Sequence, residues 1–146
     1  MERGKIGIIV CANAANEMDC CTSPCLRDYE KRAGAFERYK SKEVSLTGLI
    51  SCAGCPTMVY PEKIMRKVNS LVEFGINVIH FSYCMVALCP FIDKYINIIS
   101  QAYPDVEIIK GTHETNITVE QYKNYVKAAC AKGLKMNDVI FRRVSE

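Results

Sequence analysis

The chain has 146 residues, of which 49% are hydrophobic and 24% are charged, and its formal net charge is +3. This length and balance predict one folded domain over residues 1–146 and exclude a disordered or collagen-like chain. The weak, interspersed charge argues against nucleic acid as a partner, and the short apolar runs argue against a membrane span or a signal peptide. Nine cysteines are the unusual feature. An odd number without an export signal favours metal binding or thiol chemistry over a disulfide framework.

Short runs rich in β-branched residues alternate with segments whose apolar residues have helical spacing. The runs predict strands, and Gly34 is expected to end or kink the first helix. Thr118 and Gln121 have the spacing of a capping box at the start of the last helix. In chain order the predicted elements are strand 6–10, helix 26–39, strand 46–50, helix 61–74, strand 78–81, helix 91–103, strand 106–109, helix 118–132 and edge strand 139–144.

Strands that alternate with helices predict βαβ units and a parallel sheet with helices on both faces. Because such crossovers are right-handed, the fold class expected is α/β, a three-layer flavodoxin-like domain with four or five strands. The expected strand order is about 2-1-3-4-5, which makes the first strand an inner one.

Cysteines follow the predicted strands along the chain. One comes directly after the first strand, two come after the second and two after the third, and three more lie in the loop that leaves the first. Because the carboxyl ends of parallel strands share one edge of the sheet, we expect these eight thiols to meet there. With the histidine that follows the fourth strand, the candidate metal ligands are Cys11, Cys20, Cys21, Cys25, Cys52, Cys55, Cys84, Cys89 and His113.

Thiolates are soft ligands that suit zinc or an iron–sulfur cluster. Cys52 and Cys55 have the Cys-x-x-Cys spacing that lets two sulfurs bind one centre, and Gly54 lets the backbone bend between them. Cys89 is expected at a helix N-cap, where backbone N–H groups favour a thiolate. One tetrahedral zinc ion uses four ligands, so eight thiols favour an iron–sulfur cluster or a polynuclear site over zinc.

The remaining candidates differ in their expected roles. Cys130 lies on the last amphipathic helix and His80 lies inside the third strand, and both are expected in the core. His113 is either a ligand, a proton donor or a partner of a ligand, or else part of a structural turn, with Glu114 next to it. Adjacent Cys20 and Cys21 are not expected to bind the same metal atom.

Six segments carry motifs that are specific in combination: KIGIIVC (5–11), CTSPCL (21–26), RAGAFERY (32–39), LTGLISCAGCP (46–56), INVIHFSYCMVALCP (76–90) and KGTH (110–113). Over residues 4–113 the chain thereby resembles the CGGC-domain family, small cysteine-rich proteins regarded as metal-binding. Ala53 replaces the first glycine of the central motif, which a negative φ would tolerate. The resemblance implies no particular reaction. It implies metal binding through Cys11, Cys25, Cys52, Cys55, Cys84, Cys89, His113 and one of Cys20 or Cys21.

Two enzyme or cofactor classes with the same expected fold fit the sequence poorly. Low-molecular-weight phosphatases and arsenate reductases carry Cys-x5-Arg after the first strand, but Glu17 stands six residues beyond Cys11 and would repel a phosphate. Cys21 and Arg27 have that spacing, yet they lie too far beyond the strand. The loop after Cys11 also lacks the hydroxyl and glycine residues that an FMN phosphate requires.

The expected function is therefore metal binding for electron transfer or redox chemistry, with a redox protein as the partner. Two alternatives stay open: a zinc-binding structural or regulatory module, and a metal-free dithiol redox or sulfur-transfer protein that uses Cys52 and Cys55. Thiolate clusters oxidise readily, so the expected location is a reducing or anoxic cytoplasm. The residues do not decide whether the protein is an enzyme.

Overall fold

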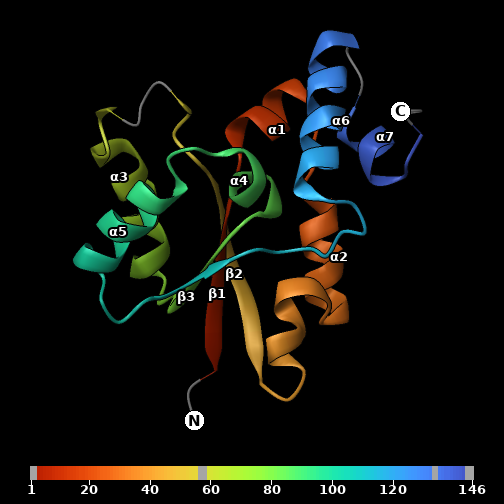
Figure 1. Cartoon of the computed structure of the whole chain (residues 1–146). Helices are drawn as coiled ribbons and strands as arrows, with labels where there is room; N and C mark the ends of the chain where they lie inside the picture. Colours follow the sequence, from red (N-terminus) through yellow and green to blue (C-terminus); the bar gives the residue numbers. More distant parts are fainter. Residues whose placement is uncertain (1–2, 56–58, 133–134, 144–146) are drawn as a thin grey trace.

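The structure is a computed structural model that describes residues 3–55, 59–132 and 135–143. Within these residues, four strands form one parallel sheet in the order β2-β1-β3-β4 (Figure 1). The flavodoxin-like order predicted from the sequence is confirmed for these strands. They are β1 (Gly4–Val10), β2 (Val44–Ser51), β3 (Val78–Phe81) and β4 (Glu107–Lys110).

Helices cover both faces of the sheet and complete the predicted three layers (Figure 1). The helices α3 (Glu62–Glu73) and α5 (Ile92–Ala102) pack on one face. The helix α2 (Ser23–Lys31) and the 3-10 helix η1 (Gly34–Tyr39) pack on the other.

Alternate side chains of β1 enter these two separate cores. Ile8 packs with the residues of α2 and η1, whereas Ile9 packs with those of α3 and α5. Gly7 pairs with Gly48 of β2, and a Cβ at Gly48 would lie 2.6 Å from the Leu71 side chain. The two glycines therefore let α3 approach the bare backbone of the sheet.

The break between α2 and η1 depends on Gly34, as the sequence predicted. Its φ is +57°, and a Cβ at this position would lie 2.5 Å from the Thr112 carbonyl oxygen. The next residue, Ala35, donates its backbone N–H to that carbonyl at 2.9 Å. The predicted helix over residues 26–39 is thus divided in two, and η1 is held against the loop that follows β4.

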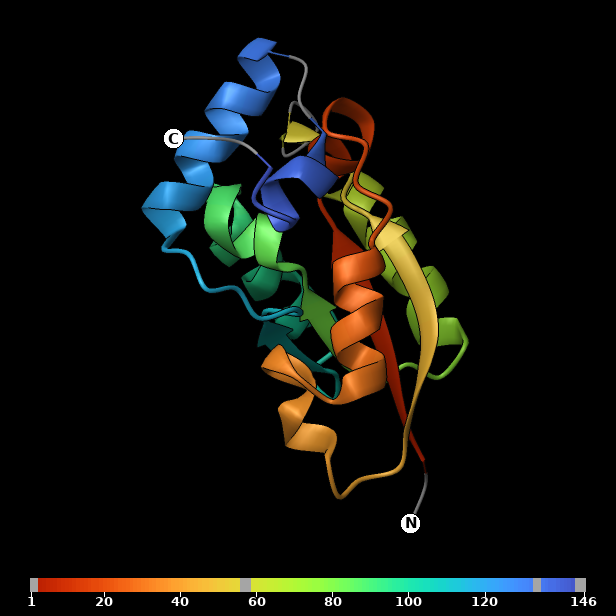
Figure 2. The same ribbon diagram turned by 90° about the vertical axis from the view of Figure 1, so that its right-hand side faces the viewer.

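Four further helices gather at the carboxyl end of the sheet (Figure 2). The predicted capping box of α6 is present, since Gln121 accepts from the Thr118 N–H at 2.9 Å and donates to its hydroxyl at 3.1 Å. The short α1 and α4 follow β1 and β3 directly and are not predicted from the sequence. The four helices are α1 (Ala12–Glu17), α4 (Tyr83–Leu88), α6 (Val119–Lys132) and α7 (Met136–Ile140).

The predicted fifth strand over residues 139–144 is wrong. Val139 and Ile140 belong to α7, and residue 144 lies outside the described residues. Met136 and Val139 are each 3% exposed and lie about one helical turn apart, so the segment buries its apolar residues with helical spacing. Asp138 accepts the Lys135 backbone N–H at 3.2 Å and so closes the start of the helix.

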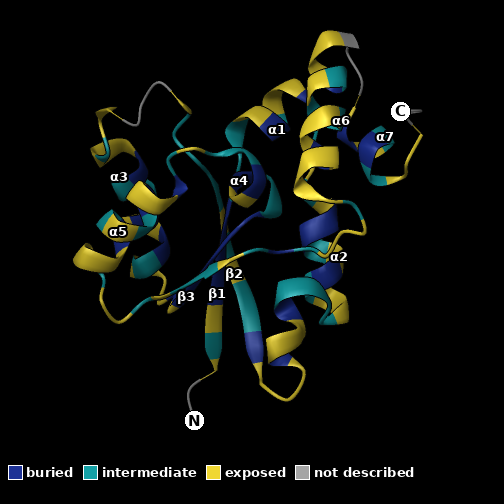
Figure 3. Ribbon diagram, viewed as in Figure 1, coloured by how far each residue is buried: buried dark blue, intermediate teal, exposed yellow. Residues whose placement is uncertain are grey.

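Burial is highest in the inner strands, as Figure 3 shows. His80 in β3 is 0% exposed, which confirms its predicted place in the core. Its Nδ1 donates to the Gly111 carbonyl at 2.8 Å, and its Nε2 therefore accepts from the Tyr39 hydroxyl at 2.8 Å. None of the helices in the described part of the chain is long and apolar enough to cross a membrane.

Candidate functional site

Cys11 lies at the centre of the thiols. It directly follows β1, an inner strand of the sheet, and stands at the N-cap of α1. Its thiol interacts with that of Cys52, which follows β2, and with that of Cys84, which follows β3 in α4. Thiols carried by three neighbouring strands therefore meet at the carboxyl edge of the sheet.

These contacts shift the three thiol pKa values in different directions. The hydrogen bond with Cys11, together with burial, raises the pKa of Cys52 well above its ordinary range. The hydrogen bond with Cys11 lowers the pKa of Cys84, and the Ser82 hydroxyl, 2.9 Å from its sulfur, lowers it further. For Cys11, Cys52 lowers the pKa, but Cys84 and burial raise it to a net value above the ordinary one. Cys84 is thus the most acidic thiol of the three.

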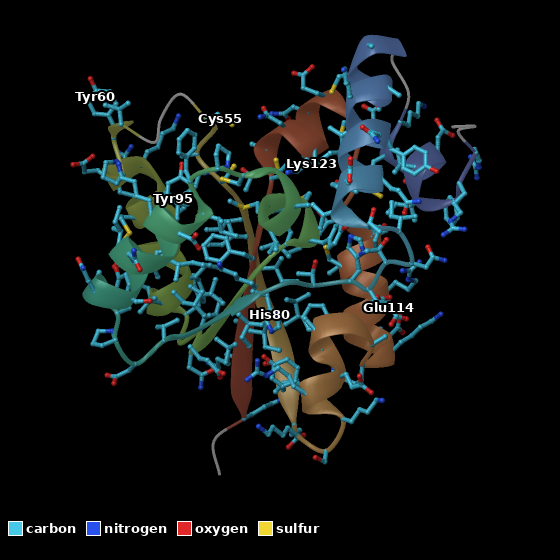
Figure 4. The ribbon with its side chains drawn as sticks, in the orientation of Figure 1. Cys55, Tyr60, His80, Tyr95, Glu114 and Lys123 are labelled. Carbon is cyan, nitrogen blue, oxygen red and sulfur yellow. The ribbon has the colours of Figure 1, made fainter. Side chains whose placement is uncertain are left out.

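A cavity of about 390 Å³ lies on one side of Cys11, and we call it the large thiol cavity. Two donors from the start of α1 reach its sulfurs: the Ala12 N–H bonds Cys52 Sγ at 3.3 Å, and Asn13 Nδ2 bonds Cys55 Sγ at 3.3 Å. Figure 4 shows Cys55 in the loop beyond β2, at the carboxyl end of the sheet. Besides apolar side chains and the polar Asn13 and Glu17 of α1, the lining contains the thiols of Cys11, Cys52, Cys55, Cys89 and Cys130.

The segment between Cys52 and Cys55 has the tight backbone that its sequence predicted. Gly54 has φ +97°, which residues with a Cβ rarely adopt, and its backbone bonds the Cys52 sulfur. Ala53 is not among the residues with positive φ, so its methyl group is accommodated without strain. One glycine is therefore enough for the turn between Cys52 and Cys55, and Ala53 does not prevent it.

A much smaller cavity of about 20 Å³ lies on the other side of Cys11, and we call it the small thiol cavity. It has room for about one water molecule. Cys25 is 5% exposed there, and burial raises its pKa to about 11. The Thr112 hydroxyl lies 3.1 Å from the Cys25 sulfur and accepts the Tyr83 N–H at 3.1 Å. The titratable residues of the lining are Cys11, Cys20, Cys25, Cys84, His113 and Tyr122.

His113 belongs to this small cavity, at the end of the loop that follows β4. Its Nδ1 donates to the backbone carbonyl of Glu114 at 3.1 Å, so the neighbour contributes its carbonyl. The ring centroid lies 5.2 Å from that of Tyr83. Burial lowers the pKa of His113, which favours the neutral imidazole that a metal ligand must be.

Two predictions about individual cysteines are wrong. Cys130 is exposed rather than buried, because Ala129 and Tyr122 occupy the inward face of α6 at 1% and 3% exposure. Its side chain instead lines the large thiol cavity. Cys89 is the C-cap of α4 and not the N-cap of a helix, and burial raises its pKa.

Cys20 and Cys21 are placed differently. Cys20 is half-buried and lines the small thiol cavity. Cys21 is exposed, lines neither thiol cavity, and has its sulfur 3.1 Å from the Ser23 hydroxyl. The adjacent thiols therefore face different surroundings.

Asn13 and Thr112 contact site thiols but are not singled out from the sequence. Asn13 lies two residues beyond Cys11, and Thr112 stands within the KGTH segment before His113. Proximity to a strand-end cysteine or histidine is the sequence feature that both share. Each contacts a thiol that is distant along the chain, Cys55 and Cys25, respectively.

All nine cysteines are free thiols. In the described part of the chain, no group of three or more His, Cys, Asp or Glu side chains is arranged to hold a metal ion. The thiols thus share cavities without being drawn together around one centre.

Comparison with known proteins gives two matches. A family model described as the CGGC domain matches residues 5–113. An uncharacterized protein of Methanocaldococcus jannaschii is 33% identical over 118 residues, which cover 75% of this chain and 86% of the relative. No solved structure gives a significant match. The matched family region ends at His113, so α6, α7 and Cys130 lie beyond it.

Proposed function

The chain belongs to the CGGC domain family, and from this premise we propose that it is a metal-binding protein with a polynuclear, thiolate-bound centre. The centre we propose is an iron–sulfur cluster at the carboxyl end of the sheet, used for electron transfer or redox chemistry. The observation that carries the proposal is the position of Cys11, whose thiol contacts both Cys52 and Cys84 from the neighbouring strands.

The donor set fits this kind of centre. The two thiol cavities share Cys11 and are lined by free, soft sulfur donors. The large cavity alone has five thiols, whereas one tetrahedral zinc ion uses four ligands. Metal binding releases the thiol protons and draws the sulfurs inward, which agrees with thiols that share a cavity without surrounding one point.

We assign the ligands by cavity. Cys11, Cys52, Cys55 and Cys89 would bind on the side of the large cavity, and Cys84 and Cys25 on the side of the small one. We infer that Cys20 rather than Cys21 joins them, because Cys20 lines the small cavity and Cys21 is exposed. His113 completes the set at the small cavity.

The chain's own groups would set the properties of the centre. The Ala12 N–H and the Asn13 amide donate to the sulfurs of Cys52 and Cys55, which withdraws electron density and raises a reduction potential. Apolar side chains such as Met85 and Leu88 line the same cavity and limit the approach of water. A bound iron–sulfur cluster supplies a site that takes up and releases single electrons.

Anaerobic purification followed by metal analysis, acid-labile sulfide analysis and a visible spectrum tests the proposal. We expect iron and sulfide in comparable amounts and broad visible absorption. A colourless protein with stoichiometric zinc and no sulfide would contradict the iron–sulfur centre and support the zinc-binding module instead.

Substitution of single cysteines tests the ligand assignment. Cys52→Ala and Cys84→Ala should each strongly reduce metal retention, since they remove thiols on the two sides of Cys11. Cys21→Ala is the matched control, because its thiol is exposed and lines neither cavity. Equal metal loss in all three variants would contradict the assignment.

A metal-free dithiol protein is the second candidate, because Cys52 and Cys55 line the same cavity and both accept hydrogen bonds from the start of α1. In that case the two thiols lose two protons and two electrons to form one disulfide. Glutathione disulfide, as the acceptor, would be reduced to two glutathione thiols. This candidate predicts a colourless protein without metal whose Cys52 and Cys55 oxidise reversibly, measured by mass spectrometry after alkylation.

A further inference from the structure

A cavity of about 470 Å³ adjoins the small thiol cavity, and we call it the polar cavity. Tyr122, Ile140 and His113 line both cavities, so they form the wall between them. The remaining sides come from the loop after β4, from Tyr83 at the start of α4, and from two arginines. Its volume lies in the range of small-molecule sites, and it is far larger than the space one water needs.

The Tyr83 hydroxyl is the first observation that points to a ligand site in this cavity. It is buried and has no hydrogen-bond partner among the described residues. Buried polar groups are nearly always paired, because an unpaired one loses its bonds to water without replacement. Tyr83 lines the polar cavity, so a small shift of its side chain would let the hydroxyl donate to an oxygen of a bound molecule there.

Two guanidinium groups line the same cavity. Arg27 pairs with the buried Asp28 through Nε at 2.8 Å, so its terminal amino groups are additional donors. Arg142 contacts the Asn116 carbonyl through Nη2 at 3.4 Å. Among the described residues, Glu114 is the one carboxylate of the lining, and it is exposed to solvent. The cavity is therefore rich in donors and suits an acceptor such as a carboxylate.

Thr115 and Asn116 add further polar groups, and another part of the lining is apolar. Ile117, Val139 and Ile140 contribute hydrocarbon surface beside the polar groups. An inorganic anion would leave this surface and most of the volume unused. An organic molecule with one carboxylate and a short apolar body uses both parts of the cavity.

We propose that the polar cavity binds a small organic carboxylate. The Tyr83 hydroxyl and the guanidinium groups of Arg27 and Arg142 hold its carboxylate, and the apolar side chains contact its carbon body. His113 stands between this ligand and the thiols of the small cavity. The site goes beyond the proposed metal function and does not depend on a metal. Only the His113 side chain would separate the bound carboxylate from the thiols.

Titration of the full chain with sodium butyrate at constant ionic strength, followed by NMR of assigned amides, tests the proposal. We expect saturable shifts around Tyr83 and His113, with a dissociation constant on the order of millimolar for about six heavy atoms. 1-Butanol, which has a similar carbon chain without the carboxylate, and inorganic phosphate should bind at least about tenfold more weakly. Absent saturation, or equal binding of 1-butanol or phosphate, would overturn the proposal.

Variants identify the groups responsible. Tyr83→Phe removes only the unpaired hydroxyl, and Arg142→Gln removes one charge; each should weaken butyrate binding about tenfold. Tyr60→Phe is the matched control, since Tyr60 is 70% exposed and lies away from this cavity (Figure 4). Unchanged affinity in both Tyr83→Phe and Arg142→Gln would overturn the proposal. The titration is run on metal-free protein, so its result is independent of whether a metal centre forms.

Discussion

The two thiol cavities on either side of Cys11 use the same chemical group in different surroundings. The large one measures about 390 Å³ and contains the exposed thiols of Cys55 and Cys130. The small one measures about 20 Å³ and contains the buried thiol of Cys25. Thiols at one sheet edge therefore differ in accessibility, and the helices and loops beyond the strand ends determine this difference.

The difference arises from what closes each cavity. The small cavity is closed by the loop after β4, which is bound to α2 and η1 through the Glu114 N–H to Asp28 Oδ2 at 2.8 Å and the Ala35 N–H to the Thr112 carbonyl at 2.9 Å. The large cavity is lined by side chains of α1, α4 and α6. The small cavity therefore borders a hydrogen-bonded loop, whereas the large cavity lies between helices.

The largest effect is expected from Cys11→Ala, because both cavities contain this thiol. Its removal should lower metal affinity more than about 100-fold. The loss of a residue that only hydrogen-bonds a metal ligand already lowers metal affinity about 10- to 100-fold. Metal content per chain, measured after anaerobic reconstitution, checks this. Cys25→Ala should remove only the contribution of the small cavity. If Cys11→Ala kept half of the metal, the two cavities would be independent sites.

A second prediction is that acidic pH lowers the free energy of unfolding through the buried residue His80. Burial lowers the pKa of His80 from 6.5 to about 4, so the folded protein holds a neutral imidazole that the unfolded chain protonates first. Its contribution is present above pH 6.5 and is lost as the pH falls toward 4, by about 3 kcal/mol of unfolding free energy. Urea unfolding at several pH values measures this. In His80→Gln the slope between pH 6.5 and 4 should flatten, and an unchanged slope would refute the assignment.

A smaller effect is expected from Thr112→Val, which keeps the shape but removes the hydroxyl between Cys25 and the Tyr83 N–H. Because Thr112 is 0% exposed, the Tyr83 N–H loses its partner, and the unfolding free energy should fall by about 1–2 kcal/mol. Thr47→Val on the exposed side of β2 is the control and should stay within about 0.5 kcal/mol.

The sheet and the gathering of thiols at its edge follow from the sequence, because inner parallel strands need continuous apolar runs and their ends share one edge. The C-terminal segment does not follow, since its β-branched residues suit a strand or a short helix equally. Contact with α6 decides, as in the Tyr122 hydroxyl that lies 3.9 Å from the Met136 sulfur. Such contacts are set by tertiary packing and have no local pattern.

The division of the thiols into two cavities also lies beyond the sequence. It depends on α1 and α4, two helices of six residues each, which are too short to be predicted from local propensity. The buried side chains of Ala14 and Met85 hold these helices in place. The prediction that Cys130 is buried is wrong for a related reason. A residue next to the buried Ala129 is turned about 100° away, and whether it is covered depends on the neighbouring helix.

The bond between Asp28 and Glu114 joins residues that are 86 positions apart, and the contact between Cys25 and Thr112 spans 87. Closing loops of this length costs entropy that only an already formed sheet can offset. Four thiols of the large cavity, by contrast, lie within the first 89 residues of the chain. A ribosome therefore releases those four before it releases the residues that close the small cavity, so the order of synthesis sets the order in which the two halves of the site become available.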